Sequence, residues 1–166
     1  MASGSLTEVN DELRSVLIGT AGLSIAAAVA LFLAVVRRVP SWSETTIRPT
    51  VRLAVAAIVL QASHFIEEFT TGFHERFPAL LGLAPWSVQF FVSFNLFWLA
   101  IWLLSAWALG ARRQAAFFPL WFLAIGCTAN GIAHPWLAMR TGASSQGSSP
   151  PCLLASSASC CSAALL

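Results

Sequence analysis

Four long runs of apolar residues restrict what this chain can fold into. They cover about residues 15–36, 51–71, 86–109 and 115–138. A helix needs about 20 apolar residues to cross a hydrocarbon core that is about 30 Å thick, and each run is long enough. Segments that contain proline or arginine separate the runs. The pattern therefore predicts four transmembrane helices.

The composition also indicates a membrane protein. Of the 166 residues, 57% are hydrophobic and 10% are charged, whereas soluble domains usually carry about 25% charged residues. We expect an all-α, polytopic transmembrane helix bundle in the cell membrane, with the lipid bilayer as its main partner. Nucleic acid is not an expected partner, because the arginines lie in short loops and form no basic face.

The chain divides into three predicted parts. Residues 1–13 are a polar N-terminal arm, residues 14–141 are the transmembrane bundle, and residues 142–166 are an irregular tail rich in Ser and Cys. From residue 143 the tail contains no charged residue. We interpret it as a segment read out of frame, with a fifth helix lost or scrambled at this end. A natural disordered end is the alternative.

Arginines gather in two of the loops between the apolar runs: Arg37, Arg38 and Arg48 precede the second run, and Arg112 and Arg113 precede the fourth. Cytoplasmic loops of membrane proteins carry an excess of basic residues. The distribution predicts an N-terminus outside the cell and both arginine loops inside.

Ionisable side chains interrupt the second run near its end. His64, Glu67 and Glu68 are spaced i, i+3 and i+4, and these positions share one face of a helix. A charged group in the middle of a membrane helix costs about 2.5–3.5 kcal/mol on insertion scales, so such residues usually face the protein interior and have a function. Two glutamates near a helix end can also simply reach the headgroup region.

Polar residues also occur in the two later runs. Asn130 and His134 are spaced i, i+4 in the fourth run, and Asn95 lies in the third. Helices joined by short loops usually pack as antiparallel neighbours, so these side chains would lie at a depth similar to that of the His64 motif. Asn95 alone is typical of hydrogen bonding between helices. Together the polar residues predict one shared site in the outer half of the bundle.

Other residues are predicted to have structural roles. His74 lies in the connection 72–85, where we expect a solvated loop residue. Cys127 is expected to behave as a small hydrophobic residue. The many Trp and Phe residues of the third run are assigned to packing and to an interfacial belt.

The polar residues also match a known pattern, which is the string His64-x-x-Glu67-Glu68 with Asn95 in an aromatic-rich run and Asn130-x-x-x-His134-Pro135 in the last one. This pattern, over about residues 50–140, resembles the HXXEE family of small prokaryotic integral membrane proteins. The resemblance implies an enzyme-like membrane protein whose reaction is not established. It also implies that the same His, Glu and Asn residues form the site.

The leading functional hypothesis is a metal-dependent intramembrane hydrolase that acts on a lipid or another amphipathic substrate. Imidazole and carboxylate ligands suit Zn, Fe or Mn, with Zn favoured. His64, Glu68 and His134 are the predicted metal ligands. Of Glu67 and Glu68, the glutamate that does not bind the metal would be the general base of a metal-bound water. Asn130 or Asn95 would orient a ligand or bind an oxyanion.

Two further functions use the same residues. A small proton- or ion-coupled transporter or channel subunit would titrate Glu67 and Glu68 and relay protons through His134. A haem protein with His64 and His134 as axial ligands is disfavoured by the glutamates beside the iron.

Overall fold

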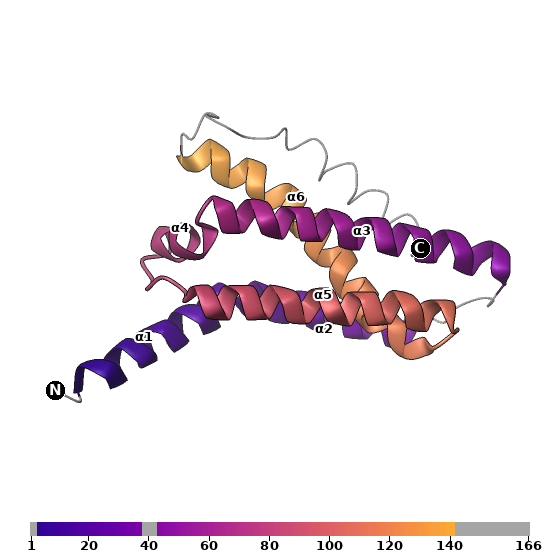
Figure 1. Cartoon of the computed structure of the whole chain (residues 1–166), viewed down its shortest axis with the longest axis horizontal. Coiled ribbons are helices and arrows are strands. Elements are labelled where there is room, and N and C mark those ends of the chain that lie inside the picture. Colours follow the sequence, from indigo (N-terminus) through magenta and orange to yellow (C-terminus); the bar gives the residue numbers. More distant parts are fainter. Residues whose placement is uncertain (1–2, 38–42, 142–166) are drawn as a thin grey trace.

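The computed structural model describes residues 3–37 and 43–141, and it describes side chains for residues 8–37 and 43–132. These residues form helices and no strand. The elements are α1 (Ser3–Gly19), α2 (Ala21–Val36), α3 (Glu44–Thr70), α4 (Phe73–Leu80), α5 (Val88–Gly110), the 3-10 helix η1 (Gln114–Ala116) and α6 (Phe117–Thr141) (Figure 1). The predicted all-helical class is confirmed. The predicted tail, 142–166, lies outside the described residues.

Several helices are long and apolar enough to cross a membrane. They are α3, α5 and the segment that contains η1 and most of α6, and the bent pair α1 and α2 is a fourth if it counts as one span. Large apolar side chains cover their outer faces. Trp107, for example, is 73% exposed and Val35 is 71% exposed. Such surfaces are unfavourable in water and agree with helices that face lipid.

The sequence predicts one continuous helix over the first apolar run, but the structure has two helices there. The run bends by 43° between α1 and α2, at Thr20, whose Oγ1 donates a hydrogen bond to the Val16 carbonyl oxygen at 2.7 Å. Gly19 precedes the bend, and the indole of Trp86 packs so closely on it that a Cβ there would collide. The bend therefore depends on a tertiary contact as well as on local sequence.

The residues predicted as a polar arm form most of α1, which is attached to the connection between α4 and α5. Ser15 is fully buried and donates from Oγ to the Ala84 carbonyl oxygen. The Ser87 backbone N–H, at the start of α5, donates to Glu12 Oε1 at 2.9 Å. A carboxylate is stabilising there because a helix N-terminus carries a partial positive charge.

The long helices pack in a non-sequential order. Helix α2 packs mainly against α6, α3 packs mainly against α5, and α6 also contacts α5 and α3. Small residues, among them Ala30, Ala57 and Ala106, are buried where the helices meet. Such residues allow helix backbones to approach closely in membrane proteins. The first half of α6 supplies much of the core, including Leu120 and Phe122.

The bundle has two distinct ends (Figure 1). At one end, Arg112 Nη2 lies 2.9 Å from Glu44 Oε1, so the connection after α5 meets the start of α3. At the other end lie the last turn of α3, α4 and the start of α5, and the final turns of α6 reach this end too. Gly72 begins α4 with a φ of 70°, a conformation that glycine adopts readily. The His64 motif belongs to this second end.

Candidate functional site

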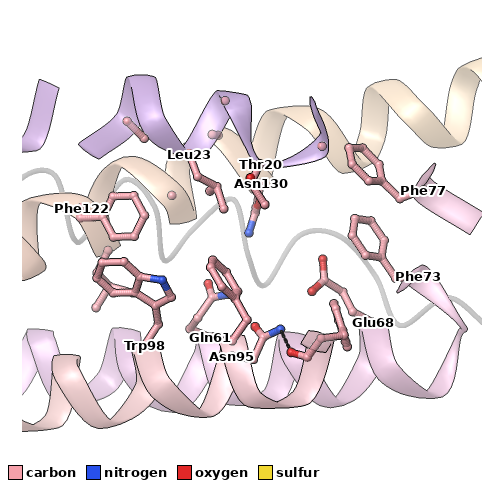
Figure 2. A pocket seen from close by; sticks show the side chains of 18 of the residues that line it. Thr20, Leu23, Gln61, Glu68, Phe73, Phe77, Asn95, Trp98, Phe122 and Asn130 are labelled. Carbon is pink, nitrogen blue, oxygen red and sulfur yellow. Dashed lines mark hydrogen bonds between the residues drawn. The ribbon is translucent and has the colours of Figure 1, made fainter. Parts of the chain in front are cut away.

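A cavity of about 370 Å³ lies between α2 and α6 on one side and α3 and α5 on the other, with α4 at one end (Figure 2). Its walls are largely aromatic. Phe90, Phe94, Trp98 and Trp102 follow one another every four residues along α5 and all line the cavity. Their successive ring centroids are 5.7, 6.5 and 5.8 Å apart. This spacing makes a continuous aromatic stripe on one face of the helix.

Polar side chains from several helices converge on the middle of this cavity and on one end of it. Gln61 and Glu68 come from α3, Asn95 from α5, Asn130 from α6 and Thr20 from the bend before α2 (Figure 2). Gln61 and Glu68 are seven residues apart, about two helical turns, so both face the same side. A largely apolar pocket with a few convergent polar groups is typical of small-molecule sites.

His64 lies behind the cavity wall and is paired with Glu68, which lines the cavity. His64 is 2% exposed, and its Nε2 atom lies 3.2 Å from Glu68 Oε1. On the other side of the ring, Nδ1 lies 4.0 Å from Glu67 Oε2. The Glu68 side chain is 12% exposed and the Glu67 side chain is 50% exposed. The imidazole therefore separates a carboxylate that lines the cavity from one at the surface.

Of the three predicted metal ligands, His64 and Glu68 lie close together. Two ligand atoms that each lie about 2.1 Å from a tetrahedral zinc are about 3.4 Å apart, so the 3.2 Å between His64 Nε2 and Glu68 Oε1 suits shared ligation as well as a hydrogen bond. Glu67 faces the opposite ring nitrogen. His134 lies in α6, but its side chain is outside the described residues. Among the described side chains, no three of His, Cys, Asp and Glu are grouped to hold a metal.

Both predicted asparagines line the cavity. Asn95 Nδ2 donates to the Phe91 carbonyl oxygen of its own helix at 2.9 Å, rather than to another helix, so its amide oxygen is the atom best placed to meet a ligand. The amide of Asn130 points into the cavity from the opposite wall, with its nitrogen foremost (Figure 2). One donor and one acceptor thus face the same space.

The prediction that His74 is a solvated loop residue is wrong. His74 is 7% exposed and lies in α4, where its ring stacks with Phe69 and Phe91 at centroid distances of 6.1 and 5.6 Å. Its carbonyl oxygen accepts a hydrogen bond from the Trp86 backbone N–H. Helix α4 folds back onto the aromatic end of the bundle, which the loop-like sequence did not indicate.

Several lining residues escaped the sequence interpretation. Gln61 is one of them, although its spacing of seven from Glu68 is a recognisable signal. Thr20 is another, and no sequence signal placed it beside helices far along the chain. The sequence predicts only packing and interfacial roles for the α5 aromatics, but they also line the cavity. Their regular spacing of four residues is the sequence signal for a shared face.

No family model matches the chain, and no curated protein or solved structure is similar to it. The resemblance to the HXXEE family thus rests on the motif residues alone, and the geometry of the cavity carries the functional argument.

Proposed function

We propose that this chain is a multi-pass protein of the cell membrane, with its N-terminus outside, that hydrolyses an amphipathic substrate held in the cavity. Glu68, paired with His64, is the proposed acid–base group. One observation carries the proposal: a carboxylate lines an aromatic cavity and lies 3.2 Å from an imidazole that is 2% exposed.

In the proposed reaction, Glu68 takes a proton from a water molecule as the water oxygen bonds to the substrate's carbonyl carbon. Glu68 then returns the proton to the leaving oxygen or nitrogen as that bond breaks. His64 holds the carboxylate in place through its Nε2 contact. The Asn130 amide donates a hydrogen bond to the oxyanion that forms between these steps. A positioned base of this kind typically contributes about 10²–10⁴-fold to a rate.

A bound metal is a further element of the proposal. The described side chains supply His64 and Glu68, which is one ligand fewer than the three that zinc enzymes use. His134 would be the third, and Zn, Fe or Mn would polarise the substrate carbonyl. With a metal bound, Glu68 would be a ligand and Glu67 would be the base. The acid–base role given to Glu68 above is its role in the site without a metal.

Proton-coupled transport is a second candidate, and one observation favours it. His64 lies between Glu68, which lines the cavity, and Glu67, which is half exposed. A chain of carboxylate, imidazole and carboxylate from a cavity to a surface is a plausible proton path in a membrane protein. In such a transporter, the cavity would bind the transported solute.

The two neighbouring glutamates provide the test. Purified protein is assayed with fluorogenic esters and amides of increasing acyl length. We expect Glu68→Gln to lower hydrolysis by at least about 10²-fold, and Glu67→Gln, at the half-exposed position, to lower it by less than about threefold.

Equal activity in wild type and Glu68→Gln would contradict the enzyme proposal. Absence of hydrolysis, together with proton flux into liposomes that stops in His64→Ala, would favour transport instead.

A further inference from the structure

The lining of the cavity changes from acidic at one end to apolar at the other (Figure 2). Glu68 lies at one end beside Phe73 and Phe77 of α4. The amides of the lining helices occupy the middle, and Trp98 and Phe122 form the opposite end. An occupant that matches this order has a charged or polar head, a short polar segment and an apolar body.

Acidic side chains predominate at the Glu68 end of the cavity. None of the described residues that line the cavity is Arg, Lys or His. Two carboxylates and one imidazole make up the nearby cluster of Glu67, His64 and Glu68, so acidic groups outnumber basic ones among the described side chains there. An anionic head would be repelled there and would find no basic partner on the described walls.

The aromatic residues around Glu68 favour a cation for a second reason. The faces of Phe and Trp rings attract ammonium groups, and cages of such rings recognise quaternary ammonium ligands. Phe73 and Phe77 stack at a centroid distance of 5.0 Å, and Trp86 lies 5.7 Å from Phe77. These three rings line the cavity at the Glu68 end.

The volume limits the size of the ligand. A cavity of about 370 Å³ lies near the lower end of the range of about 300–1,000 Å³ that is usual for small-molecule sites. That is enough for one short chain or ring and a head group. A lipid with two long acyl chains would extend well beyond the cavity.

We propose that the cavity binds single-chain cationic amphiphiles, with the ammonium head between Glu68 and the α4 aromatics and the apolar body against Trp98 and Phe122. This inference deepens the proposed function, on which it rests for the cavity being a substrate site, by naming the chemical class of the substrate. A free amine and the choline head of a single-chain phospholipid share this chemistry.

The test uses three probes of nearly equal shape, phenylbutylamine, phenylbutanol and phenylbutyrate, titrated into detergent-purified protein by calorimetry. We expect the amine to bind at least tenfold more tightly than the alcohol, and the butyrate to bind most weakly. Glu68→Gln should abolish the difference between amine and alcohol. Glu75→Gln, at an exposed carboxylate outside the cavity, is the matched control and should preserve it.

A steric pair of variants checks that the probes occupy this cavity. Gly126 lines it, and a Cβ added there meets no atom within 4 Å. Gly126→Leu should therefore fill the space and weaken both amine and alcohol at least tenfold. Gly110 also has open space around it but lies outside the cavity, so Gly110→Leu should leave both affinities unchanged.

The outcomes separate this inference from the hydrolase proposal. Tightest binding of the butyrate, or equal binding of amine and alcohol, would overturn the cationic class. Binding of none of the probes would overturn it as well. Selective amine binding without any hydrolysis would sustain the ligand class and contradict only the hydrolase. A short lysophosphatidylcholine that competes with the amine would support a lipid head as the source, and failure to compete would support a free amine.

Discussion

At the scale of single residues, the clearest contrast is between two identical neighbours. Glu67 and Glu68 are adjacent, and a helix turns by about 100° from one residue to the next. That rotation leaves the Glu67 side chain 50% exposed and the Glu68 side chain 12% exposed. Each carboxylate approaches a different nitrogen of His64. Sequence alone could not distinguish their roles, because it does not say which face of α3 meets the other helices.

Metal content is a prediction at this scale. If His64, Glu68 and His134 bind a divalent metal, purified protein should contain about one equivalent, because three protein ligands hold a catalytic zinc. Elemental analysis of protein purified without chelator measures it. His134→Ala should lose the metal, and Glu67→Gln, which faces the other ring nitrogen, should keep it. A wild-type protein with no more metal than the His134→Ala variant would rule out the metal.

At the scale of helices, one glycine permits a close contact with its helix and another leaves open space beside its helix. Gly19 ends α1 against the indole of Trp86, where a Cβ would collide. Gly126 sits within α6, where a Cβ would enter open space. The same residue type thus permits a close contact in one helix and leaves a gap in another, and only the packing distinguishes the two cases.

The same substitution should therefore change stability in opposite directions at the two glycines. Gly126→Ala should raise the free energy of unfolding by up to about 1 kcal/mol, because alanine is the better helix former. Gly19→Ala should lower it by about 1–3 kcal/mol, since overpacking forces neighbouring atoms to move. Thermal unfolding in detergent compares both with wild type. A stabilising Gly19→Ala would show that Trp86 does not pack there as described.

At the scale of the whole molecule, the arrangement of the ends bears on membrane orientation. The connection after α5 meets the start of α3 through Arg112 and Glu44, so these two loop regions lie at one end, as the predicted topology requires. The pair is exposed, and such pairs contribute about 0–1 kcal/mol. The contact reports the arrangement of the loops more than it stabilises them.

Orientation can be measured by cysteine labelling in a background without native cysteines. With both arginine loops in the cytoplasm, Ser43→Cys and Arg112→Cys should react with a membrane-impermeant maleimide only after the cells are opened. Thr71→Cys, exposed at the other end of α3, should react in intact cells. Labelling of position 43 or 112 in intact cells would reverse the orientation and place the Glu68 end of the cavity at the inner leaflet.

Local properties could be predicted from the sequence because they depend on nearest neighbours along the chain. Apolar run length indicated helices long enough for a membrane, and helical spacing placed His64, Glu67 and Glu68 on adjoining positions of one helix. The bend at Thr20 and the burial of His74 could not be predicted, because the contacts of Gly19 with Trp86 and of His74 with Phe91 form only when separate segments of the chain pack together.

The sequence by itself thus determined the helical class, the apolar character of the helices and the identity of several polar residues near one end of the bundle. The tertiary structure decided that α2 packs on α6 and α3 on α5, and that Gln61, Asn95 and Asn130 meet in one aromatic cavity. The physical reason is that apolar helices all satisfy the same hydrophobic pattern. Their pairing depends on the fit of small and aromatic side chains across interfaces, which no periodicity along one helix contains.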